Sequence, residues 1–348
     1  MSDQFELTCR LPLLDEQGLL TRPGYARAPF WDYRREAVKA SSLRRKEWDY
    51  YLISNGRFAL ALTISDLGYA GMHTVSLIDL EARRETTCSS LGSPPGKKDK
   101  LPEQSEYGNC HASGRGFGMH FLNDGKNRTL IVQMRRFAKE GPLSARIELT
   151  EEPQDSMCIA TPFEEPGCFY YNRKIPCLRA SGTVSCGGRD YVFDPADSFA
   201  VLDWGRGVWP GHVTWYWSAA SGMTPDGTRT FGFNLGYGFG DTSAATENML
   251  FCDGRAHKLG EVHFEIPMTD KGKYDYMKAP WHISSEDGRL DLAFKPVLDR
   301  KSHTNLLAVK SDQHQVFGHF SGRAVLDDGE EILLQEFPGF AERVENKW

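Results

Sequence analysis

Large apolar side chains alternate with small or polar ones along most of the chain, which is the pattern of β-strands with one buried face. The clearest runs are residues 58–65 and 290–295. Asn-Gly or Asp-Gly dipeptides, which suit hairpin turns with a positive φ, recur at 55–56, 124–125, 226–227, 253–254, 287–288 and 328–329. The pattern predicts antiparallel sheets, and only residues 35–47 look helical.

The pattern also repeats within the chain. Residues 48–71 align with residues 215–240, each with an aromatic strand, a glycine-bearing turn, an alternating strand and then DLGY or NLGY. Residues 181–193 likewise match residues 321–334. We therefore predict an N-terminal arm with a short helix (1–47) and two copies of one β unit (48–200 and 201–348). Because closure removes exposed strand edges, we expect two consecutive antiparallel β-barrels with very little helix.

Composition narrows the function classes. The 348 residues include 41 basic and 47 acidic ones, a formal charge of -6, and no basic tail. This balance argues against nucleic acid as a partner. The eight cysteines form no CxxC pair, and no nucleotide or hydrolase motif is complete, so we predict no metal and no cofactor. Without a leader or a long apolar run, we expect a cytoplasmic protein with no integral membrane association. The sequence allows either a monomer or a homodimer.

Residues 203–222 hold four of the eight tryptophans. Trp215 and Trp217 share one strand face, and they either line a ligand cavity or fill a core. Asp203 and Arg206 are costly to bury unless they are paired or functional. They are therefore either site residues or a structural salt bridge.

Residues 231–240 alternate aromatic or aliphatic side chains, Tyr237 among them, with glycines and Asn234. The strand face that carries only glycines and Asn234 predicts that a ligand or another strand lies close to the backbone. Asp241, Glu247 and Asn248 follow this strand. Two carboxylates there suit acid and base roles or a hard cation, whereas capping of the loop is the structural alternative. Tyr171 lies in a polar and aromatic segment, residues 170–174, that precedes the second unit.

Residues 198–222 and 226–248, with PFWDYRR (29–35) and GFAERVENKW (339–348), resemble a large bacterial family of domains of unknown function over nearly the whole chain. More distantly, an Asp-Trp-Gly that enters a Trp-x-Trp strand is similar to the tandem lipocalin-like proteins, which include AttH-like proteins and carotenoid hydratases. The resemblance implies two calycin-type, lipocalin-like barrels. Some of those relatives carry out acid chemistry on apolar polyenes, so the resemblance also raises that activity as an expectation for this chain.

The leading hypothesis is an enzyme that binds a hydrophobic or polyene-like small molecule and catalyses cofactor-free hydration, isomerisation or cyclisation. Asp203 is its general acid, and indoles shield a developing carbocation. The candidate catalytic residues are Asp203, Arg206, Asp241 and Glu247. The candidate ligand-binding residues are Trp204, Trp209, Trp215, Trp217, Asn234, Tyr237, Asn248 and Tyr171. A non-catalytic carrier of an apolar ligand and a carbohydrate-active protein remain the alternatives.

Overall fold

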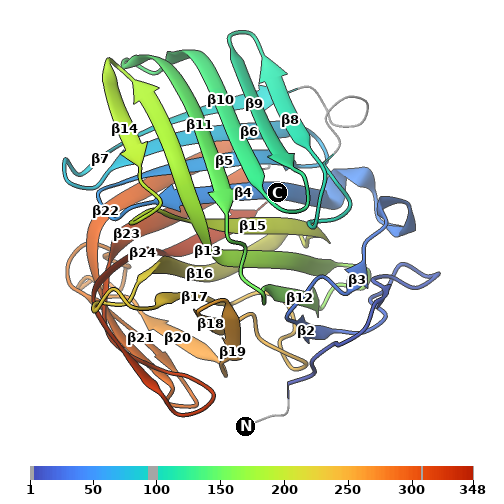
Figure 1. Cartoon of the computed structure of the whole chain (residues 1–348). Helices are drawn as coiled ribbons and strands as arrows, with labels where there is room; N and C mark the ends of the chain where they lie inside the picture. The colour runs from blue at the N-terminus through green and yellow to red at the C-terminus, as the bar shows by residue number, and fades with distance from the viewer. Residues whose placement is uncertain (1–3, 93–100, 307–308, 348) are drawn as a thin grey trace.

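A computed structural model describes residues 4–92, 101–306 and 309–347. It confirms the all-β fold with two barrel-like sheets, one above the other in Figure 1. Apart from one short parallel pair in the arm, all paired strands are antiparallel. None of the helical segments in the described residues is long and apolar enough to cross a membrane.

The first sheet forms a nearly closed barrel, whose end strands β7 and β8 lie close to one another. Its main path runs β7-β6-β5-β4-β15-β13-β11-β10-β9-β8, and β2, β12 and β14 are attached to it. Its strands are β2 (Gly24–Ala26), β4 (Arg45–Ser54), β5 (Phe58–Asp66), β6 (Gly71–Asp79), β7 (Arg84–Gly92), β8 (Cys110–Gly114), β9 (Phe117–Asn123), β10 (Arg128–Phe137), β11 (Gly141–Thr150), β12 (Met157–Pro162), β13 (Phe169–Cys186), β14 (Arg189–Phe193) and β15 (Phe199–Val208).

The second sheet is a half-barrel with the order β19-β18-β17-β16-β24-β23-β22-β21-β20. Three long strands, β22 to β24, form its curved back in Figure 1. Its strands are β16 (His212–Met223), β17 (Thr230–Tyr237), β18 (Met249–Cys252), β19 (Arg255–Lys258), β20 (Val262–Glu265), β21 (Trp281–Ser285), β22 (Leu290–Leu306), β23 (Val309–Val325) and β24 (Glu331–Lys347).

Both sheets follow one topological plan. The first strand of each unit, β4 or β16, pairs with the last strand, β15 or β24. Gly182 and Gly322, at matching places in the repeat, have φ angles of 142° and 143°, and at each a Cβ would lie within 2.2 Å of a carbonyl oxygen on the neighbouring strand. Because β15 closes the first sheet, residues 201–208 belong to that sheet, although the repeat alignment had grouped them with the second unit.

The N-terminal arm contains less helix than its sequence predicts. Residues 35–47 hold two one-turn 3-10 helices, Arg35–Ala37 (η1) and Ser42–Arg44 (η2), and β4 then begins at Arg45. The charged run at 45–47 therefore enters a strand. Two short strands, β1 (Leu11–Pro12) and β3 (Trp31–Asp32), form the parallel pair in this arm.

The outer faces of the two sheets pack together along a contact that we call the seam. It lies between β4, β13 and β15 of the first sheet and β16, β17 and β24 of the second. Alternation along β15 decides which side chains reach it: Val201 packs into the seam, whereas Leu202 and Trp204 point into the first barrel. Two apolar clusters fill the seam, one around Trp209 and the other around Phe340.

Candidate functional site

A cluster of polar side chains lies buried in the seam. Lys174 on β13 and Asp203 on β15 are register partners, and Lys174 Nζ lies 3.0 Å from Asp203 Oδ2. Asn172 donates a 2.6 Å hydrogen bond to the other Asp203 oxygen. The Lys174 ammonium also lies 3.8 Å from the ring centroid of Trp217 on the opposite sheet, a cation–π distance. Lysine and aspartate therefore form an ion pair within the first sheet, and the contact of the lysine with Trp217 reaches the second sheet.

Glu342 on β24 is the second member of the cluster. Its two oxygens accept 2.9 Å hydrogen bonds, one from the Trp215 indole and the other from the Gln315 amide. Burial raises the pKa of Glu342 to about 7, against the opposing effects of Trp215 and of the cations Arg300 and Lys174. Burial thus favours the protonated form of this carboxyl.

Glu247 lies across the seam from the ion pair, just before β18. Its side chain lies over Gly236, where a Cβ would come within 1.7 Å of Glu247 Oε1. Burial raises the pKa of Glu247 to about 7, and repulsion from Asp203 adds to the shift. Lys174 and the hydrogen bond with the Tyr170 hydroxyl act in the opposite direction. The glycine-bearing face of β17 is therefore occupied here by a carboxyl of the same chain.

Asn234 connects Glu247 to the tryptophan wall. It accepts a 2.7 Å hydrogen bond from the Trp217 indole and donates one of 2.9 Å to the Glu247 carbonyl. Asn248 accepts a 2.7 Å hydrogen bond from the Gly236 backbone N–H. These contacts fix the segment that carries Glu247, so the carboxyl and the indole keep one relative placement.

Charge in the cluster is unbalanced. We use the name seam cluster for five residues: Lys174, Asp203, Trp217, Glu247 and Glu342. Three of them are carboxylic acids and one is a lysine, and the Lys174 charge acts on both glutamates. Two further cations act on these acids from outside the cluster, Arg300 on Glu342 and Lys258 on Glu247. Burial outweighs all of these charges, so the pKa of both glutamates is raised.

Two indoles connect the cluster to the surface. Trp48 and Trp215 are only partly buried, and each packs against both apolar clusters of the seam. Trp215 is bonded directly to Glu342. Trp215 therefore links the partly exposed edge of the seam to the buried Glu342 carboxyl.

Sequence analysis predicted part of this cluster. The structure brings together Asp203, Glu247, Trp215, Trp217 and Asn234, with Asn248 next to them. Trp209 also lies in the seam, where its ring packs 5.4 Å from Tyr170 and 5.7 Å from Trp215. Trp215 and Trp217 share the seam face of β16, as the alternation predicts.

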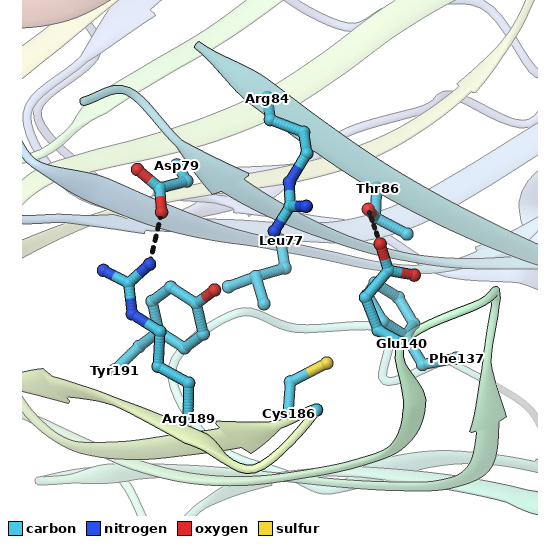
Figure 2. A pocket seen from close by; sticks show the side chains of 10 residues that line it. Leu77, Asp79, Arg84, Thr86, Phe137, Glu140, Cys186, Arg189 and Tyr191 are labelled. Carbon is cyan, nitrogen blue, oxygen red and sulfur yellow. Dashed lines mark hydrogen bonds and ion pairs between the residues drawn. The ribbon is translucent and has the colours of Figure 1, made fainter. Parts of the chain in front are cut away.

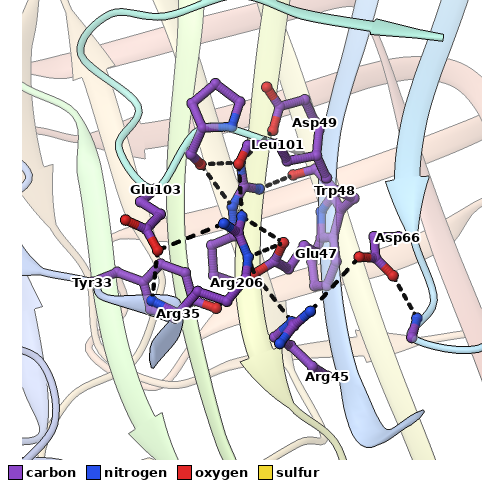
Figure 3. A network of polar contacts seen from close by, with 12 residues as sticks. Tyr33, Arg35, Arg45, Glu47, Trp48, Asp49, Asp66, Leu101, Glu103 and Arg206 are labelled. Atoms are coloured by element: carbon purple, nitrogen blue, oxygen red, sulfur yellow. Dashed lines mark hydrogen bonds and ion pairs between the residues drawn. The ribbon is translucent and has the colours of Figure 1, made fainter. Parts of the chain in front are cut away.

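Arg206 lies elsewhere and does not pair with Asp203. It points to the inner side of β15, where its guanidinium lies 2.9 Å from Asp49 Oδ1 and 4.0 Å from the Trp204 ring centroid (Figure 3). It also donates to the carbonyl oxygens of Trp48, Gly205 and Pro102. Arg206 is fully buried and fully bonded, so it holds the segment after Leu101 against the barrel.

Figure 3 shows the rest of this buried network. Glu47 accepts hydrogen bonds from the Tyr33 hydroxyl at 2.6 Å and from Arg35 at 2.9 Å. Burial alone would raise the pKa of Glu47, but the nearby Arg206 and Arg35 lower it overall. The network ties the N-terminal arm to the first barrel, so loss of any one partner would leave a buried charge unpaired.

Four further predicted residues lie away from the seam cluster. Trp204 and Tyr171 pack edge to face inside the first barrel, 5.4 Å apart. Tyr237 stacks on Tyr216 on the inner side of the second sheet. Asp241 is exposed and caps its own loop by accepting from Ser243 N, as the capping alternative describes.

The structure adds residues that sequence analysis did not select. Lys174, Glu342, Tyr170 and Gln315 all face the seam. A signal existed for the first sheet, because Tyr170, Asn172 and Lys174 are spaced by two and so share one strand face. Among the described residues, no group of three or more His, Cys, Asp or Glu side chains is placed to hold a metal ion.

The fold is that of the all-β double-barrel proteins. Kievitone hydratase from Nectria haematococca has 11% sequence identity and a TM-score of 0.50, and the match covers 97% of this chain and 98% of that one. CghA, solved with Sch210972, has 11% identity and a TM-score of 0.56, covering 99% and 97%. An AttH-like protein from Nitrosomonas europaea has 13% identity and a TM-score of 0.46, covering 90% and 95%.

The chain belongs to the family described as Domain of unknown function (DUF2804), whose model matches residues 4–348. This agrees with the family resemblance of its sequence motifs. No curated protein sequence matches the chain.

Proposed function

We propose that the seam cluster is the active site of an enzyme that acts on a small, largely apolar molecule by acid–base catalysis. The observation that carries the proposal is Glu342, a buried carboxyl with a pKa raised to about 7, bonded to the partly exposed indole of Trp215. A general acid works best when its pKa lies near the working pH. Two solved proteins of the same fold support this proposal: one is called kievitone hydratase, and the other is CghA, solved with Sch210972.

The geometry supports a division of roles. Glu342 donates a proton to an unsaturated or carbonyl group of the substrate, and the face of Trp215 stabilises the positive charge that develops. Water then adds to the cation and loses a proton to the Glu342 carboxylate, which gives hydration. Loss of a neighbouring proton from the cation to the same carboxylate gives isomerisation, and attack by a second double bond of the substrate before that loss gives cyclisation. Asp203 is not assigned the acid role here, because it forms an ion pair with the Lys174 ammonium, which favours the ionised carboxylate, whereas the two groups that donate to Glu342 are a neutral indole and a neutral amide. It orients Lys174 instead.

The experiment compares the wild type with Glu342→Gln, which keeps the shape of the side chain and removes its titratable proton. Each protein is incubated with a small-molecule extract of the host in H₂¹⁸O and in D₂O, and the mixtures are compared by mass spectrometry. Hydration adds ¹⁸O, and isomerisation or cyclisation through a carbocation adds deuterium. We expect products from the wild type and a loss of about 100-fold or more in the variant, since general acids contribute about 10²–10⁴-fold.

A matched control is Glu331→Gln, on the same strand but half-exposed and paired with Arg323. It should retain the wild-type rate. If an apolar molecule co-purifies unchanged with both the wild type and Glu342→Gln, and neither protein forms a product, the protein is a carrier. If products form at equal rates with and without Glu342, the acid assignment is wrong.

A further inference from the structure

A cavity lies at the end of the first barrel, away from the seam (Figure 2). It measures about 210 Å³ and lies between the β6–β7, β10–β11 and β13–β14 hairpins. At about 30 Å³ for each water in the liquid, this is room for about seven waters or for a molecule of similar size. Leu77, Phe137 and Tyr191 give the cavity apolar walls.

Four charged side chains also line this cavity, two of each sign. Arg189 and Asp79 satisfy one another at 2.7 Å. Arg84 and Glu140 line the same cavity but form no ion pair with one another, and Arg84 has no ion-pair partner among the described residues. One cation and one anion thus border a common space without direct contact.

Glu140 is only half satisfied. One of its oxygens accepts a 3.1 Å hydrogen bond from Thr86, and the other, Oε2, is buried and has no donor. A buried acceptor without a donor is costly unless something else supplies one. Arg84 is exposed and offers only donors, so it can donate to an acceptor that enters the cavity. Glu140 can accept from a donor in the same cavity, so the two side chains suit a ligand with one charge of each sign.

We propose that this cavity binds a small zwitterion of the amino-acid type, with its carboxylate at Arg84 and its ammonium at Glu140. A net-neutral ligand matches the balanced charge of the four side chains, so no net charge is buried on binding. The Cys186 thiol also faces the cavity, and burial raises its pKa, so it remains a neutral contact. The proposal is independent of the seam.

The probes are glycine, β-alanine, 4-aminobutyrate and 5-aminovalerate, which separate the two charges by increasing lengths. Butyrate and butylamine, each with a single charge, are the matched controls. Calorimetry on the full chain, with ¹⁵N NMR to locate the perturbed residues, gives the affinities. We expect at least one zwitterion to bind with a Kd of about 1 mM or below and to bind about tenfold more tightly than either single-charge control.

Two variants test the residues: Arg84→Gln and Glu140→Gln should each weaken that binding about tenfold. Gln at 140 can still accept from Thr86, and Arg84 is exposed, so both variants should fold. Arg136→Gln, an exposed arginine on β10 outside the cavity, should bind as the wild type does. Three results would each overturn the proposal: no zwitterion binds, butylamine or butyrate binds equally well, or the two variants retain full affinity.

Discussion

Glu247 and Glu342 show how a single side chain can be tuned by its surroundings. Each is fully enclosed, and for each the largest cause of the raised pKa is burial rather than any one neighbour. Lys174 acts in the opposite direction on both of them. Exposure of either glutamate to solvent would therefore lower its pKa, whereas loss of the Lys174 charge would raise it further.

A pH dependence of stability follows from Glu342. Its pKa is about 7 in the fold and about 4.3 in an unfolded chain. Between these values the folded protein keeps a proton that the unfolded chain has lost, so the free energy of unfolding falls as the pH rises through this range. We expect Glu342→Gln to reduce that fall by about 2–3 kcal/mol between pH 5 and pH 8.

Urea unfolding at both pH values measures this effect. Glu331→Gln should keep the wild-type dependence, because its carboxylate is half-exposed. An equal pH dependence in the wild type and in Glu342→Gln would show that the Glu342 carboxyl does not retain its proton in the fold.

At the scale of the element, β15 uses its two faces for different tasks. Asp203 and Gly205 face the seam, whereas Trp204 and Arg206 face the first barrel. The Trp48 indole lies so close to Gly205 that a Cβ there would come within 2.2 Å of the ring. Small residues on the seam face of β15 therefore let a tryptophan lie flat against the strand.

We expect Gly205→Ala to destabilise the protein by about 1–3 kcal/mol, because the Trp48 ring must move to accommodate the methyl group. The Trp48 fluorescence should shift with it. Gly118→Ala is the control: Gly118 also lies in a strand, its φ is not positive, and its nearest atom is 3.9 Å from the added Cβ. Equal stabilities for the two variants, measured by thermal unfolding, would mean that Trp48 is not held against β15.

For Arg206 we expect a local effect, in which the segment after Leu101 loosens when the guanidinium is removed. Arg206→Met leaves Asp49 buried without its cation and removes the hydrogen bonds to the Pro102 carbonyl. Breaking a buried pair on one side costs about 3–5 kcal/mol. We expect limited proteolysis to cut within residues 101–109 in the variant before it cuts elsewhere. Arg115→Met, which replaces an exposed arginine on a hairpin, should leave the cleavage pattern unchanged.

The same strand shows what sequence could predict and why. Period-two alternation correctly placed Trp215 with Trp217, and the apolar side chains of β17 opposite its glycines, because each pattern lies within one strand. The cost of burying Asp203 and Arg206 led to two alternatives, functional residues or a salt bridge between them. Once this segment is a strand, residues three apart lie on opposite faces.

The membership of the seam cluster follows from non-local pairing instead. Lys174, Glu247 and Glu342 come from β13, from the segment before β18 and from β24, and no local motif shows that the three residues meet. They meet because two sheets pack back to back, and a single sequence gives no register for that contact. Burial of an acid, which sets its pKa, is likewise a property of the packed sheets.

At the scale of the whole molecule, we expect the seam to make the two repeated sheets into one cooperative unit. Three kinds of contact cross it: the Lys174 ammonium over Trp217, the Arg300 hydrogen bond to Ser76 and the apolar packing around Phe340. Each sheet alone would expose the face that the other now covers. A defect in the seam should therefore loosen both sheets, although the altered residue belongs to only one.

Lys174→Met tests this coupling. The variant leaves Asp203 buried without its cation, at a cost of about 3–5 kcal/mol. Hydrogen exchange should increase in β15 and equally in β16 and β24 of the other sheet, and the double variant Lys174→Met/Asp203→Asn should recover much of the protection because it removes the unpaired charge. Arg189→Met breaks the Asp79 ion pair far from the seam, so its effect should stay within the first sheet. Faster exchange in β13 and β15 alone after Lys174→Met would mean that the two sheets unfold independently and that the seam holds a site without holding the molecule together.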